Sequence, residues 1–287
     1  MPRYRKTEKQ ILAAAVEMAE AGVHLIDLTM GDDPFLHSCG DLGPARLKNM
    51  IEIVQRETGL PIMLSPGILP DDTLAELADI GVTWYACYQE THNQNLYKTL
   101  RQGQDFGIRI EKKQFARKCG MLIEEGILTG VGESLEDLAD SIFWMKENAV
   151  DQARVMTFVP QQDTPMADYT LQKSLQELKT IAVIRLMISD ILIPASLDVN
   201  GLSGLKERLN AGANVVTSIV PPYKALAGVA NSTLDIEEAR RSLENILPVI
   251  KRCGLKAATR EDYLHWVNAR VGRKQSYQEL QENLQCT

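Results

Sequence analysis

Four residues of this chain have side chains that could bind an amino acid, and each lies in a short apolar stretch of β type. Asp27 lies in "LIDLTM", Arg154 in "ARVMTFVP", and Ser196 and Asp198 in "ILIPASLDV". An arginine can clamp a carboxylate, an aspartate can accept hydrogen bonds from an ammonium group, and a serine adds a neutral hydrogen bond. One positive and two negative groups suit a zwitterion that carries a second ammonium, such as a diamino acid.

The period of a β-strand places these side chains on shared faces. Strict alternation puts Leu25, Asp27 and Thr29 on one face of their stretch, and it groups Ser196 with Asp198 in theirs. A charged group inside an apolar strand is costly unless it is paired or hydrogen-bonded. We therefore expect these groups to meet one another or a ligand. A salt-bridge network that only ties strands together explains the pattern equally well.

These stretches belong to a pattern that runs along the whole chain. Short apolar runs of β type alternate with amphipathic segments whose apolar residues recur at three- and four-residue spacing. The runs cover residues 23–30, 61–66, 82–90, 120–128, 153–160, 191–199 and 213–221. This alternation predicts repeated βα units around a parallel sheet. About seven units approach the eight of a (β/α)8 TIM-type barrel, and an open doubly wound sheet is the competing architecture.

Length, composition and charge limit the classes of protein. The 287 residues suffice for one barrel or two smaller domains, and 45% hydrophobic with 24% charged residues indicates a folded globular chain. A formal net charge of −7 argues against a nucleic-acid surface or an anionic membrane surface. No apolar run approaches the roughly 20 residues of a membrane helix. We expect a cytoplasmic protein with a small-molecule ligand, no nucleic-acid partner and no membrane partner.

Weaker candidates lie outside these four positions. Glu90 ends the run at 82–90, where a barrel places ligand-binding groups, and a carboxylate there suits a sugar diol or another polar ligand. Arg109 follows after a short polar stretch. Taken singly, both are more typical of solvated loop residues. The Gly130 and Gly132 pair lacks the third glycine of a dinucleotide fingerprint and predicts a strand-to-helix turn, with Ser134 as the helix N-cap.

Metal-binding patterns are absent from the sequence. The four histidines show no ligand spacing, so a zinc or iron site built from them is not expected. The cysteines are isolated from one another and offer neither a disulfide framework nor a C-x-x-C knuckle. They are Cys39, Cys87, Cys119, Cys253 and Cys286. None of the β-type runs contains a lysine for a Schiff base, which disfavours a cofactor-free aldolase, whereas Asp27 as a simple general base stays open.

Segments spread over nearly the whole chain together resemble one family, the methylornithine synthases. These are lysine mutases of pyrrolysine biosynthesis, radical S-adenosylmethionine enzymes related to biotin synthase. The matching segments are "DLTMGDDP", "LPIMLSPG", "YQET", "EEGILTGVG", "RVMTFVPQQDTP", "LIPASLD" and "RLNAGANVVTSIVPP". The resemblance runs in order from about "YRKTEKQI" to about "GLKAATREDY", which is more specific than any single motif.

The resemblance implies an isomerase built on a radical S-adenosylmethionine barrel. In such an enzyme a 4Fe-4S cluster cleaves S-adenosyl-L-methionine, and the resulting 5′-deoxyadenosyl radical takes a hydrogen from L-lysine, which rearranges to (3R)-3-methyl-D-ornithine. A reductant protein such as flavodoxin or ferredoxin would supply the electron.

The resemblance also assigns roles to residues. The positions that match the family's substrate-binding residues are Asp27, Arg154, Ser196 and Asp198. The positions that match contacts to S-adenosyl-L-methionine are Met30, Gly31, Asp32, Glu90 and Arg109. No catalytic residue and no metal ligand is assigned. Asp32 stands where the family more often has glutamate, in a strand-end motif whose backbone carbonyls meet the methionyl amino group.

One large departure concerns the cluster. The family holds its cluster by C-x-x-x-C-x-x-C after the first strand, before the point where this chain begins, and the sequence contains no such motif. We therefore expect residues 1–255 to form about seven βα units of the barrel, without the first unit. Residues 256–287 are expected to form a helical extension packed on the barrel or trailing from it. The chain as given is expected to be inactive, and the alternative is a non-catalytic diamino-acid-binding or interaction protein derived from that enzyme.

Overall fold

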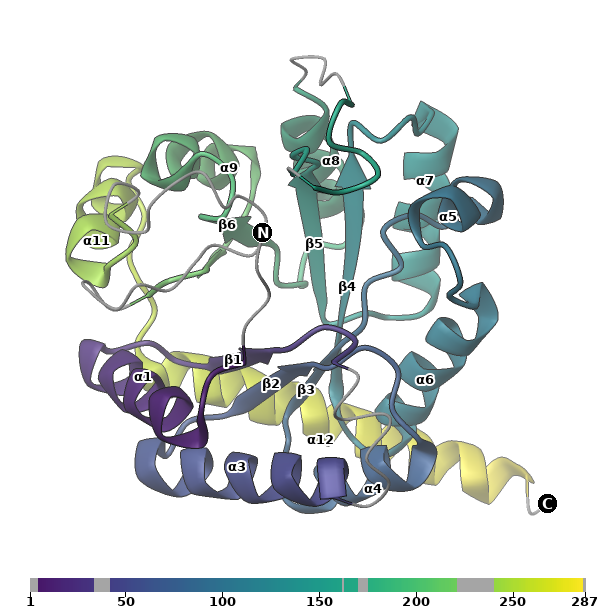
Figure 1. Cartoon of the computed structure of the whole chain (residues 1–287), viewed down its shortest axis with the longest axis vertical. Coiled ribbons are helices and arrows are strands. Elements are labelled where there is room, and N and C mark those ends of the chain that lie inside the picture. The colour runs from purple at the N-terminus through teal and green to yellow at the C-terminus, as the bar shows by residue number, and fades with distance from the viewer. Residues whose placement is uncertain (1–4, 34–41, 162, 170–174, 221–239, 286–287) are drawn as a thin grey trace.

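Seven short parallel strands form the wall of a TIM-type α/β barrel (Figure 1). The computed structural model describes residues 5–33, 42–161, 163–169, 175–220 and 240–285. One sheet contains, in this order, β1 (Ile26–Thr29), β2 (Ile62–Ser65), β3 (Trp84–Ala86), β4 (Leu122–Thr129) and β5 (Gln152–Thr157). A second parallel pair contains β6 (Pro194–Ser196) and β7 (Val215–Thr217). Each predicted run therefore overlaps one strand.

The order of the strands decides between the two architectures considered. They follow one another from β1 to β5 without the reversal that defines a doubly wound sheet. An isolated bridge between Gln152 and Leu192 joins the two sheets at their β5–β6 edge. No ladder between β7 and β1 occurs in the described residues, so hydrogen bonds there do not close the wall. The prediction of a parallel TIM-type α/β fold is thus confirmed.

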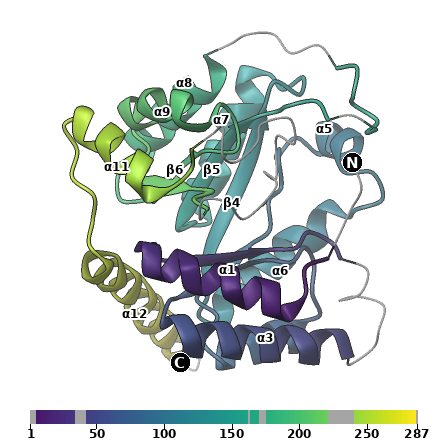
Figure 2. The ribbon, with the colours of Figure 1, turned by 60° about the vertical axis from the view of Figure 1, so that its left-hand side comes forward.

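Helices cover the outer face of the strands (Figures 1 and 2). They are α1 (Glu8–Ala21), α3 (Leu42–Thr58), α4 (Asp71–Asp79), α5 (Gln94–Leu100), α6 (Phe106–Lys118), α7 (Leu135–Glu147), α8 (Gln176–Met187), η1 (Gly201–Gly204), α9 (Leu205–Ala211), α11 (Leu243–Arg252) and α12 (Arg260–Gln285). The predicted cap of α7 is confirmed, because the side chains of Ser134 and Asp137 each accept a backbone N–H of the other. Arg109, which taken singly is more typical of a solvated loop residue, lies in a helix instead, because α6 begins at Phe106 and is capped by Asp105.

Alternation along the strands separates an apolar outside from a polar inside. Ile26 of β1 and Ile123 of β4 point outward into a core shared with the helices, and Val155 of β5 does the same on the other side of the barrel. Their strand neighbours Asp27 and Arg154 therefore face the interior of the barrel, which we call the lumen. The sequence of each strand thus fixes which side chains reach the lumen.

Helix α12 lies across the base of the barrel, away from the carboxyl ends of the strands (Figures 1 and 2). An apolar layer at the base, which includes Trp84, Leu122 and Leu192, packs against Val267 of α12. The rings of Trp84 and Trp266 stack 6.1 Å apart and 4° from parallel. These contacts keep water from the lower end of the lumen. None of the described helices is long and apolar enough to cross a membrane.

Arg270 ties α12 to the barrel and provides a test of this packing. Its Nε donates to Asp151 Oδ1 at 3.0 Å and its Nη1 to Asp190 Oδ2 at 2.6 Å, and Asp151 is fully buried. We expect Arg270→Ala to lower the free energy of unfolding by about 1–3 kcal/mol, because the buried Asp151 carboxylate loses the nearer of its two guanidinium partners and keeps only Arg117 at 3.9 Å. Urea denaturation measures this. The control is Arg260→Ala, an exposed position of the same helix. Equal losses in the two variants would contradict the assignment.

Candidate functional site

The structure brings the four predicted substrate-binding residues together in the lumen. Asp27 comes from β1 and Arg154 from β5, while Ser196 ends β6 and Asp198 follows two residues later. The charges of Arg154 and Asp198 both act on the Asp27 carboxyl, so these groups share one electrostatic environment. A single ligand in the lumen can therefore reach residues that lie up to 171 positions apart in the chain.

Glu124, which the sequence interpretation missed, organises the middle of the lumen. It lies on β4, fully buried, and its carboxylate accepts hydrogen bonds from three side chains, each at 2.8 Å. The donors are Tyr88 Oη, Gln152 Nε2 and Arg154 Nε. Gly126 allows this arrangement, because a Cβ there would come within 2.7 Å of the Tyr88 ring. The alternation rule that selected Asp27 would also have placed Glu124 in the lumen.

Arg154 is held from two directions before any ligand binds. Its Nε pairs with Glu124, and its Nη1 donates to Thr217 Oγ1 of β7 at 3.0 Å. Its guanidinium also lies 5.7 Å from the centroid of the Tyr88 ring. Burial opposes the charged form of Arg154, but the nearby carboxylate of Glu124 outweighs burial and raises the pKa of Arg154 above its usual value. The guanidinium therefore stays charged. A ligand carboxylate would have to share Arg154 with Glu124, which the expected clamp did not include.

Asp27 is the carboxylate of the lumen without a compensating cation. Its side chain is accessible to solvent, and it makes no ion pair with any residue that the structure describes. The surrounding barrel wall makes ionisation costly and, together with the negative charge of Glu124, raises the pKa of Asp27 to about 7. Arg154 acts in the opposite direction but does not cancel these effects. A cation placed beside Asp27 would favour its charged form.

Asp198 has partners of its own, and two of them were not predicted. Arg241 Nη1 donates to Asp198 Oδ1 at 2.7 Å, and Ser218 Oγ donates to Oδ2 at 2.7 Å. The predicted residue Ser196 also reaches Oδ2, at 3.4 Å, and its Oγ lies 3.3 Å from that of Ser218. Arg241 had no signal in the sequence, since it lies far from any strand and only the fold brings it to Asp198.

The charges of the lumen do not balance. Asp27, Glu124 and Asp198 can each carry a negative charge, and Arg154 and Arg241 each carry a positive one. With all five groups ionised, the described lumen carries one excess negative charge. A ligand with one carboxylate and two ammonium groups would neutralise it. Glu124 and Arg241, the two charged residues that the sequence interpretation missed, have opposite charges and therefore leave the predicted charge preference unchanged.

Polar residues at the carboxyl ends of β1 and β3 form a rim above the lumen. Gln104 Nε2 donates to Asp32 Oδ2 at 2.7 Å, Arg101 Nη1 donates to Gln104 Oε1 at 3.1 Å, and Arg101 Nη2 pairs with Glu90 Oε1 at 2.5 Å. The predicted cofactor-binding residues Asp32 and Glu90 are therefore linked through two residues that the sequence did not reveal. Glu90 has a φ of 67°, an uncommon conformation for a non-glycine residue, which typically marks functional positions.

The other predicted cofactor-binding residues contribute differently. The backbone N–H groups of Met30 and Gly31 both donate to Ser65 O, at 3.2 and 3.1 Å, which fixes the turn after β1. Arg109 is buried in α6, where its Nε donates to Tyr88 O at 3.2 Å, and its Nη1 finds no hydrogen-bond partner in the described part of the chain. Arg109 therefore supports the end of β3 from the helix side of the barrel wall. The two carboxylates of the rim accept hydrogen bonds, which fits a ligand that carries hydroxyl and ammonium groups.

The described residues do not fit a 4Fe-4S cluster. Cys87 follows β3, Cys119 ends α6 and Cys253 ends α11, and all three are free thiols on separate elements. No group of three or more potential metal ligands occurs among the residues whose positions are given. Cys39 and Cys286 lie outside the described residues.

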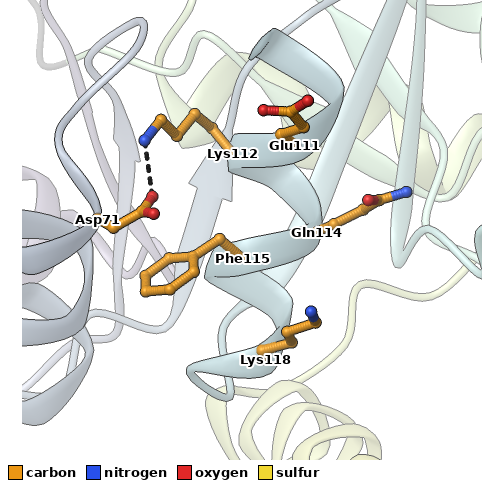
Figure 3. A pocket seen from close by; sticks show the side chains of 6 residues that line it. All are labelled: Asp71, Glu111, Lys112, Gln114, Phe115 and Lys118. Atoms are coloured by element: carbon orange, nitrogen blue, oxygen red, sulfur yellow. Dashed lines mark hydrogen bonds and ion pairs between the residues drawn. The ribbon is translucent and has the colours of Figure 1, made fainter. Parts of the chain in front are cut away.

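A separate hollow lies on the outer surface, between α4 and α6 (Figure 3). Its lining residues are Asp71, Glu111, Lys112, Gln114, Phe115 and Lys118. Lys112 pairs with Asp71 across it at 2.6 Å, and Asp71 is an exposed residue. The charged groups there are hydrated and face away from the lumen, so this hollow contributes nothing to the site.

The influence of Glu124 on Asp27 can be measured directly. We expect Glu124→Gln to lower the pKa of Asp27 below its value of about 7, because the variant removes a negative charge and frees Arg154 to stabilise the Asp27 carboxylate. A carboxyl ¹³C NMR titration measures this, with the Asp27 signal assigned from its loss in Asp27→Asn. Glu111→Gln, an exposed change on α6, serves as the control. An unchanged Asp27 pKa in Glu124→Gln would show that the two carboxyls do not interact.

Comparison with known proteins shows what the chain as a whole is similar to. No protein-family model matches the chain. The 3-methylornithine synthase of Methanosarcina barkeri is 43% identical over 261 residues, which cover 91% of this chain and 73% of that protein. The enzyme of the same name from Methanosarcina acetivorans is 42% identical over the same length. The crystal structure of a methylornithine synthase superposes with a TM-score of 0.86 at 42% identity, covering 93% of this chain and 78% of that one.

Both the sequence and the fold therefore agree with the resemblance that the motifs indicated. The similarity extends over the strands that carry the lumen residues rather than over one local motif. The chain belongs to the methylornithine synthase family.

Proposed function

We propose that this chain is the substrate-binding barrel of a radical S-adenosylmethionine isomerase that converts L-lysine to (3R)-3-methyl-D-ornithine in pyrrolysine biosynthesis. The observation that carries the proposal is the lumen itself, where Asp27 and Asp198 lie with Arg154 in a site of one excess negative charge. L-lysine has the complementary charges, one carboxylate and two ammonium groups. Family membership supports the assignment of the reaction.

In this proposal the lumen binds and orients lysine. Arg154, held by Glu124 and Thr217, receives the carboxylate by a charge-assisted hydrogen bond. Asp27 and Asp198 each accept from one ammonium group, and Ser196 adds a neutral hydrogen bond beside Asp198. Contacts at both ends of lysine fix its carbon chain between them, which is what a reaction at one selected carbon requires.

The rim above the lumen is the proposed binding site for S-adenosyl-L-methionine. Met30, Gly31, Asp32 and Glu90 lie there at the ends of β1 and β3. In the family this cofactor, once cleaved at a 4Fe-4S cluster, supplies the group that abstracts hydrogen from lysine. The residues that the structure describes do not fit such a cluster. A flavodoxin or ferredoxin reductant and a cytoplasmic location belong to the same proposal.

A diamino-acid-binding protein without catalysis is the second candidate. It is favoured by one specific observation, the lack of C-x-x-x-C-x-x-C in the 287 residues. It uses the same lumen and the same charges, and it differs only in lacking turnover. Lysine binding is therefore common to both candidates and tests the site on which both depend.

Lysine binding should depend on pH through Asp27. Asp27 has a pKa of about 7 and binds an ammonium group best when charged, so we expect the affinity for L-lysine to rise from about pH 6 to about pH 8, where both ammonium groups of lysine remain protonated. In Asp27→Asn the affinity should fall about tenfold or more, and the pH dependence should disappear. Isothermal titration calorimetry at several pH values measures both effects.

The control is Asp72→Asn, an exposed change on α4 outside the barrel, which should leave binding unaltered. Arg154→Ala should abolish measurable binding, since it removes the cation that faces the carboxylate and leaves Glu124 buried without it. If Asp27→Asn bound lysine as tightly as the unchanged chain at every pH, the lumen would not be the lysine site.

A further inference from the structure

Arg241 contacts the proposed substrate-binding residue Asp198 from a distant part of the chain. Its side chain is only 1% exposed, and Nη1 donates to Asp198 Oδ1 at 2.7 Å. The backbone carbonyl of Arg241 accepts from Val220 N at 3.2 Å, which anchors it beside the end of β7. A buried guanidinium is thus brought to one oxygen of a carboxylate that faces the lumen.

This ion pair is poorly built for stability alone. The Nε and Nη2 atoms of Arg241 are buried and find no hydrogen-bond partner among the residues that the structure describes. Burying a guanidinium costs several kcal/mol, and a pair normally offsets this cost only when its remaining donors are satisfied. Buried polar groups that stay unsatisfied are typical of positions kept for function. Stability alone does not explain why Arg241 is buried here, so we look for its role in the hydrogen bond that it donates to Asp198.

The other oxygen of Asp198 is held by a strained residue. Ser218 Oγ donates to Oδ2 at 2.7 Å, and Ser218 has a φ of 62°, in the left-handed region that non-glycine residues rarely adopt. Such strain persists only where the surroundings enforce it, and it clusters at binding and catalytic sites. Two independent irregularities, one in Arg241 and one in Ser218, thus converge on a single carboxylate.

We propose that Arg241 is a positioning residue that holds the Asp198 carboxylate in the orientation that receives an ammonium group of the substrate. The inference rests on the proposed function and extends it to a residue outside the predicted site. Without the guanidinium, Asp198 Oδ1 would lose its charged donor, and only the serine hydroxyls on Oδ2 would orient the carboxylate. Asp27 supplies the uncompensated charge, whereas Asp198 supplies a fixed direction.

A double-mutant cycle separates action through Asp198 from a general structural effect. Calorimetric titration with L-lysine is done on the unchanged chain, Arg241→Gln, Asp198→Asn and the double variant. We expect each single change to weaken binding about tenfold or more, and the double variant to bind about as Asp198→Asn does, because Arg241 has nothing left to position. Arg241→Lys, which keeps the charge, should recover part of the lost affinity.

Controls keep this outcome distinct from failure of the proposed function. Arg240→Gln changes the exposed neighbour of Arg241 and should bind lysine normally, and circular dichroism checks that each variant is folded. Unchanged or tighter binding by Arg241→Gln, or losses that multiply in the double variant, would overturn the role of Arg241. Lack of lysine binding by the unchanged chain would instead overturn the proposed function itself.

Discussion

The buried ion pair between Glu124 and Arg154 is the constraint on which the rest of the site depends. It joins β4 to β5 inside the lumen, and Tyr88, Gln152 and Thr217 satisfy further atoms of the same two groups. Removing one member of such a pair costs about 3–5 kcal/mol, because the other charge stays buried without compensation. The pair therefore fixes a guanidinium in the lumen and leaves a negative charge close enough to Asp27 to raise its pKa.

The surrounding fold makes this arrangement possible. The outward faces of the strands are apolar and pack under the helices. The polar side chains that alternation places inward therefore share the lumen. Stacking of Trp266 on Trp84 excludes water from the base, and Gly126 makes room for Tyr88 beside Glu124. A lumen closed below and lined by charge can hold a small charged ligand, with the cofactor candidates Asp32 and Glu90 at the opposite end.

The sequence predicted the parts of this structure that depend on local order. Strand positions, the parallel barrel and the cap at Ser134 follow from alternation and capping chemistry, and they were confirmed. Glu124 obeys the same alternation and was missed only because its stretch was treated as an apolar strand. Arg241, Arg101 and Gln104 had no local signal, since their roles come from chain segments that the fold brings together. Arg109 was taken as more typical of a solvated loop residue, whereas the cap at Asp105 places it in α6, where it is buried.

Turnover measures most directly whether this barrel binds lysine for rearrangement. The chain would be joined to an N-terminal segment that carries the C-x-x-x-C-x-x-C motif expected for the family, reconstituted without oxygen and supplied with S-adenosyl-L-methionine, a reductant and L-lysine. We expect methylornithine, which has the same mass as lysine, to appear in the product mixture, and the Asp27→Asn form to make none. A fusion that holds its cluster and binds lysine but returns it unchanged would show that the lumen does not bind lysine for rearrangement.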